Sequence, residues 1–102
     1  MGGQLERAAV EQGARDLLVL LRQREGLEHL DVEVRGDAVI LFSTEDGEKV
    51  RRARFTALGA GHYGLSLTRH TGRWERTPFH GPLSEVVEVL VSQLGFHLAR
   101  FP

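Results

Sequence analysis

The sequence predicts an α+β domain, residues 1–102, in which a four- to five-stranded antiparallel meander sheet is flanked by an N-terminal and a C-terminal helix. Three observations support this fold class. Apolar residues recur with a helical period at both ends of the chain, they alternate with a period of two in between, and glycine-containing turns separate the alternating runs. Because each element must bury its apolar side, we expect both helices to pack on one face of the sheet.

The N-terminal helix is expected over residues 4–24. Its apolar positions lie close to one helical stripe, formed by Leu5, Ala9, Leu17, Leu20 and Leu21. Gly13 interrupts the helix and costs about 1 kcal/mol relative to alanine. We therefore expect the helix either to lie tightly against another element at Gly13 or to begin after it.

Five strands are predicted, over residues 30–35, 38–42, 48–58, 62–70 and 73–79. Gly36-Asp37 suits a two-residue hairpin turn between the first two strands, and 45–47 supplies the next turn. Pro78 lacks an N–H group, so it either ends the fifth strand or confines that strand to an edge of the sheet.

The C-terminal helix follows Gly81-Pro82, and Gly95 stands where a left-handed cap would end it. Its buried face is predicted to contain Leu83, Val86, Val87, Leu90 and Leu94. An apolar tail formed by Phe96, Leu98 and Phe101 follows, and we expect it to dock on the core or on another subunit.

This order of elements, with Trp74 on the strand before the last helix, resembles in outline that of the frataxin-like proteins. The likeness covers element order over most of the chain and no specific motif. Frataxin-like proteins cluster acidic side chains on the first helix, whereas here Glu6, Glu11 and Asp16 alternate with arginines. No iron-binding residue is therefore carried over.

Composition limits the function classes. The chain has no cysteine, which excludes disulfides and thiol catalysis. No apolar run approaches the roughly 18 residues of a membrane span, so we expect a cytoplasmic protein without a membrane partner. Twelve of the 13 basic residues are arginine, a bias typical of a G+C-rich genome and hence of a bacterial protein.

A literal G-x-G-x-x-G pattern occurs at Gly59, Gly61 and Gly64. A dinucleotide site requires these glycines between a strand and a helix, so that the helix N-terminus meets the pyrophosphate. Here a run with strand period follows the glycines. We therefore interpret Gly59-Ala60-Gly61 as a hairpin turn, and we expect neither a dinucleotide nor any other cofactor.

No catalytic or metal-binding constellation stands out. The five histidines show no chelating spacing, so no metal site is predicted. No serine lies in a nucleophile elbow, and no catalytic residue is assigned. The sequence favours a non-catalytic protein. The alternative is a small enzyme, or enzyme subunit, that uses His62, His70 or His80 as an acid or base.

Charge is distributed unevenly along the chain. Residues 1–48 contain 11 acidic and 5 basic residues, whereas residues 49–80 contain 7 basic residues and one acidic residue. If Ala53, Phe55 and Ala57 face the helices, Arg52 and Arg54 point to the open face of the sheet. By the same alternation Lys49 and Arg51 would point to the helix side with Ala53, but their long side chains can reach solvent because they lie near the end of the strand.

The fifth strand adds further residues to this surface, with Trp74 or Tyr63 as an aromatic ring. The candidate anion- or partner-binding residues are Arg52, Arg54, Arg73, Trp74 and Arg76. A solvated face without a function is one interpretation. As a site, it suits an acidic protein surface or a second copy of the chain in a homodimer, and nucleic acid is the alternative. The expected function is that of a protein-interaction module.

Overall fold

The computed structural model describes residues 2–68, 72–93 and 95, with side chains from residue 7 onward. The elements follow one another as α1 (Gly2–Arg22), β1 (Leu30–Arg35), β2 (Ala38–Glu45), β3 (Glu48–Gly59), β4 (His62–Thr68), β5 (Trp74–Pro82) and α2 (Leu83–Gln93). The strands form one antiparallel sheet in the order β1-β2-β3-β4-β5. The predicted α+β meander with one helix at each end is confirmed.

Tight turns connect the first four strands, because residues with positive φ stand where the chain reverses. Gly36 (φ 59°) lies in the β1–β2 turn, and Asp46 (52°) and Gly47 (80°) form the β2–β3 turn. Gly59, Ala60 and Gly61 all have positive φ and reverse the chain between β3 and β4. The glycine motif is therefore a hairpin turn, as predicted, and no helix follows it.

The bounds of several elements differ from the prediction. α1 begins at Gly2 and ends at Arg22, and β2 continues to Glu45 in the long β2–β3 hairpin. β5 continues through Pro78 to Pro82, which an edge strand tolerates because its outer N–H groups need no partner. The edge interpretation of Pro78 is confirmed. The predictions for Leu94, Phe96, Leu98 and Phe101 lie outside the described residues.

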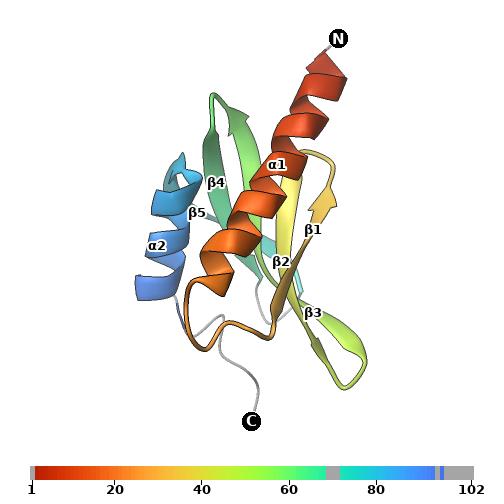
Figure 1. Ribbon diagram of the computed structural model, residues 1–102, viewed down its shortest axis with the longest axis vertical. Helices are drawn as coiled ribbons and strands as arrows, with labels where there is room; N and C mark the ends of the chain where they lie inside the picture. The colour runs from red at the N-terminus through yellow and green to blue at the C-terminus, as the bar shows by residue number, and fades with distance from the viewer. Residues whose placement is uncertain (1, 69–71, 94, 96–102) are drawn as a thin grey trace.

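Both helices cover the same face of the sheet, and the core lies between (Figure 1). The helices contribute Val10, Ala14, Leu17, Leu21, Val86, Val87 and Leu90, and the sheet contributes chiefly Leu30, Val39, Leu41, Ala53, Phe55, Tyr63 and Leu65. No helix of the described part of the chain covers the opposite face of the sheet, which is called the open face below. Within the described residues no helix is long and apolar enough to span a membrane.

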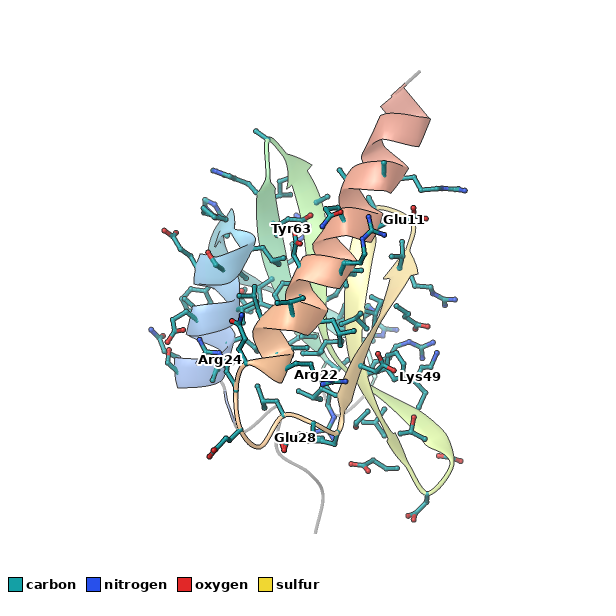
Figure 2. The ribbon with its side chains drawn as sticks, viewed as in Figure 1. Glu11, Arg22, Arg24, Glu28, Lys49 and Tyr63 are labelled. Atoms are coloured by element: carbon teal, nitrogen blue, oxygen red, sulfur yellow. The ribbon has the colours of Figure 1, made fainter. Side chains whose placement is uncertain are left out.

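Gly13 allows α1 to approach the sheet closely. The ring of Tyr63, on β4, lies beside α1 (Figure 2), and its hydroxyl is 3.5 Å from the carbonyl oxygen of Ala9. A Cβ atom at Gly13 would overlap the Tyr63 hydroxyl oxygen and lie 3.0 Å from Cζ. The sequence expectation that α1 lies tightly against another element at Gly13 is confirmed.

The end of α1 and the loop to β1 are held by polar contacts. Arg22 donates hydrogen bonds to the carbonyl oxygens of Leu27 and Leu30, and Arg24 forms an ion pair with Glu88 of α2. The carboxylate of Glu28 accepts a hydrogen bond of 2.7 Å from the N–H of Gly26, which lowers the pKa of Glu28. These contacts fix the turn that directs the chain into the sheet.

Candidate functional site

The pairing register places the outward-facing residues of the sheet in rows across the open face. Residues that pair directly in an antiparallel sheet lie on the same face, so the row can be followed from strand to strand. The central row, from β1 to β5, is Glu33, Ile40, Arg54, Ser66 and Arg76. The next row towards the β3–β4 turn is Arg35, Ala38, Thr56, Gly64 and His80.

A groove of about 590 Å³ lies across this face. The floor of the groove includes the small residues Ala38, Gly64 and Ser66. Their short side chains leave a depression beside the longer side chains of β3 and β5. Ser66 is buried although it faces away from the helices. Its long-chain neighbours in the row are Arg54 and Arg76, so these side chains border the groove.

Four arginines line the groove, namely Arg35, Arg51, Arg54 and Arg76. Among the described residues the ion pairs are Arg24–Glu88, Lys49–Glu33 and Arg52–Glu45, and none of them includes a groove arginine. Asp37 is the one carboxylate among the lining residues. The groove therefore carries an excess of positive charge that the described part of the chain does not pair.

Arg54 and Trp74 contact each other in the groove. The guanidinium carbon of Arg54 lies 5.1 Å from the centre of the Trp74 ring, within the range of a cation–π interaction. The Nε atom of Arg54 is buried and makes no hydrogen bond within the structure. Because Nε is covered, a group that enters the groove would meet the terminal N–H groups of the half-buried Arg54 instead.

The predicted position of Arg52 on the open face is wrong. In the pairing of β2 with β3, Leu41 faces Ala53 and Phe42 faces Arg51, so Arg52 is the extra residue of a β-bulge. The bulge turns its side chain to the helix-covered side. There Arg52 is 4% exposed and donates to the Ser43 hydroxyl at 2.9 and 3.1 Å and to Glu45 at 3.2 Å.

The environment of Arg52 indicates a structural role. Its burial lowers its pKa, and the charge of Glu45 partly opposes this effect. Removal of one member of such a buried pair leaves the other without a partner, which costs far more than an exposed pair contributes. Arg52, a candidate binding residue in the sequence analysis, therefore stabilises the fold and does not line the groove.

The same bulge corrects the parity predicted for its neighbours. Lys49 and Arg51 face outward with Thr44 and Phe42, their partners on β2. Lys49 bonds to Glu33 at 2.7 Å and lies 4.5 Å from the centre of the Phe42 ring, whereas Arg51 lines the groove. A period-two alternation cannot reveal a bulge, because the extra residue leaves no mark in the apolar pattern.

The other candidate residues have different positions. Trp74 and Arg76 line the groove as predicted for an open-face site, whereas Arg73 is exposed just before β5 and does not line it. Tyr63 is buried beneath α1 and supplies no ring to the open face, so that alternative is wrong. Arg35 was not selected from the sequence, and it lines the groove beside Ala38, its partner on β2.

Two of the three histidines proposed as acid or base lie in the described part of the chain. His80 lines the groove and His62 is exposed at the start of β4, while His70 lies outside the described residues. Neither His62 nor His80 forms an ion pair with a carboxylate there. Within the same residues, no three histidine, aspartate or glutamate side chains come together as a metal site would require.

Comparison of the chain with protein-family models, with curated proteins and with solved structures yields no match. The resemblance to the frataxin-like proteins is therefore one of element order alone.

Proposed function

We propose that this chain is a non-catalytic protein-interaction module whose open sheet face binds an acidic segment of a partner protein. The observation that carries the proposal is the groove, where four arginine side chains surround a floor of small residues without a carboxylate partner in the described structure. Guanidinium groups bind carboxylates through two parallel hydrogen bonds, which gives both affinity and orientation.

The composition of the groove suits a protein interface. Arginine and tryptophan dominate the energetically important positions of such interfaces, because they combine a large contact area with a polar group. Arg54 and Trp74 already contact each other in the free protein, so each restricts the movement of the other. A preordered pair loses less conformational entropy when the partner binds.

Acidic residues beside the groove favour a short acidic segment over a long polyanion. Asp31 and Glu33 face outward on β1, and Asp37 lines the groove. A nucleic acid strand that extended beyond the arginines towards β1 would meet these carboxylates. The net charge of −1 also provides no long-range attraction for a polyanion.

The partner is proposed to be another cytoplasmic protein or a second copy of this chain. Self-association is included because residues 1–48 are predominantly acidic and could supply the acidic surface. The closed two-fold dimer is the commonest soluble assembly of this kind.

Trp74 provides the test, since it is the single tryptophan of the chain and lines the groove. Its fluorescence is recorded while glutamate-rich peptides, and separately single- and double-stranded oligonucleotides, are added over a series of salt concentrations. Arg54→Gln and Arg76→Gln each remove one groove charge, and Arg7→Gln on α1 removes one charge from an exposed site on the helix side. Light scattering determines the oligomeric state in parallel.

The proposal expects saturable binding of the peptide that weakens as salt is added. Affinity should fall about tenfold in each groove variant and change less than twofold in Arg7→Gln. Binding of oligonucleotides with no binding of acidic peptides would overturn the proposal in favour of a nucleic-acid surface. A concentration-dependent dimer that the groove variants dissociate would identify the second copy as the partner.

A further inference from the structure

We propose, on the basis of the function above, that the groove recognises a two-part motif: an acidic side chain at Arg54 and Arg76, and an apolar side chain at Leu58, about four residues away along an extended segment. The inference extends the proposed function because it names the pattern that the partner presents. A basic surface alone would accept any acidic segment.

The apolar end of the groove is formed around Leu58. This leucine is 58% exposed and faces the groove near the end of β3. Its side chain lies over Gly64, because a Cβ atom at Gly64 would be 3.4 Å from Leu58 Cδ1. Ala38 and the half-buried Phe79 line the same groove. Isolated exposed leucines are common on protein surfaces, but here the leucine shares a concave site with other apolar groups.

The cationic end lies at the row Arg54, Ser66 and Arg76, across β3, β4 and β5. Alternate strands are separated by about 9.5 Å, a distance that two arginine side chains can span from both sides. Ser66 between them has a small side chain that the neighbouring side chains cover, so a ligand would lie above it, against the guanidinium groups. A carboxylate bound there would meet the terminal guanidinium N–H groups of both arginines, since Arg54 is half-buried and Arg76 is exposed.

The distance between the two ends sets the spacing of the motif. Arg54 and Leu58 lie four positions apart on one strand and both line the groove, with Leu58 at the register shift between Ala57 and Gly59. At about 3.3 Å per residue of regular strand, their Cα atoms are at most about 13 Å apart. A bound segment that extends along β3 would present side chains to the groove at the same interval. An acidic residue and an apolar residue four positions apart would then reach Arg54 and Leu58 together.

The experiment compares three peptides of about ten residues, otherwise composed of serine and glycine. The first contains two adjacent glutamates and a leucine four positions beyond the second glutamate. The second has serine in place of the leucine, and the third has the leucine directly beside the glutamates. Binding is followed by the fluorescence of Trp74 in the wild-type chain, in Leu58→Ser and in Val19→Ser. Val19, on α1, is 56% exposed and provides the matched apolar control.

The inference expects the first peptide to bind about tenfold more tightly than the other two, which corresponds to partial burial of one leucine. Leu58→Ser should remove this difference, and Val19→Ser should preserve it. Equal affinity for all three peptides would overturn the two-part motif and leave the binding of acidic segments intact. Failure of all three peptides to bind would overturn the proposed function itself, and these two failures are therefore distinguishable.

Discussion

The guanidinium of Arg54 lies over the indole ring of Trp74, with 5.1 Å between the guanidinium carbon and the ring centre. The two residues come from different strands, β3 and β5, with β4 between them. Their contact therefore spans β4 on the open face. It positions a cation and an aromatic ring at the same groove, which is why both side chains are expected to respond to a bound partner.

The aromatic ring of Trp74 should contribute directly to the binding of acidic peptides. We expect Trp74→Leu to weaken binding about tenfold, because the variant loses both the cation–π contact and a large contact surface. Trp74→Phe keeps a ring and should lose about threefold or less. Titration calorimetry measures both affinities without the tryptophan signal. Phe42→Leu is the control, since Phe42 faces outward beneath Lys49 and does not line the groove; an equal loss in that variant would argue against a specific role of Trp74.

Substitutions of Arg52 and Arg54 should separate stability from binding. Arg52→Ala should lower the free energy of unfolding by about 2–4 kcal/mol, because it removes buried bonds to Ser43 and Glu45. Arg54→Ala should change stability by about 1 kcal/mol or less and weaken peptide binding about tenfold. Urea unfolding and peptide titration, performed on both variants, check this. Intact stability in Arg52→Ala together with lost binding would contradict the structural role of Arg52.

Much of the fold follows from the sequence because the local patterns are strong. Strand alternation predicts the strands, the glycines predict the turns and the apolar face predicts α2. Each of these local predictions agrees with the observed fold. The bulge at Arg52 could not be predicted in this way. It depends on the pairing of β3 with β2, and a single extra residue inverts the faces of everything before it in the strand.

The candidate site was predicted in part for the same reason. Arg54, Trp74 and Arg76 lie beyond the bulge or on another strand, and their outward positions agree with the alternation. Arg51 was missed because the bulge reverses its predicted face, and Arg35 was missed because it belongs to the groove only through neighbours distant in the sequence. A groove floor of small residues likewise has no local signature, since alanine, serine and glycine occur on any strand.

Gly13 should be intolerant of a side chain despite its position within a helix. Alanine normally stabilises a helix by about 1 kcal/mol relative to glycine, yet we expect Gly13→Ala to destabilise the protein by about 1–3 kcal/mol. The added Cβ atom would overlap the hydroxyl of Tyr63. The same substitution in a Tyr63→Phe background should cost less, because the nearest clashing atom is absent. Denaturant unfolding of the wild type, the two single variants and the double variant gives the interaction free energy between positions 13 and 63. An equal cost of Gly13→Ala in both backgrounds would show that the clash is not with the Tyr63 hydroxyl.

Tyr63 should make the protein sensitive to alkaline pH. Burial, and to a smaller extent the charge of Asp16, raises the pKa of Tyr63 above its ordinary value of 10.0. Because the pKa is higher in the folded than in the unfolded state, the stabilisation is complete below about pH 10 and is lost as the pH rises through the raised folded-state pKa. The free energy of unfolding should therefore decrease over this range more steeply in the wild-type protein than in Tyr63→Phe. As the chain contains one tyrosine, the ultraviolet absorbance of its phenolate reports the titration directly; a midpoint at the ordinary value in the folded protein would show that α1 does not shield the hydroxyl.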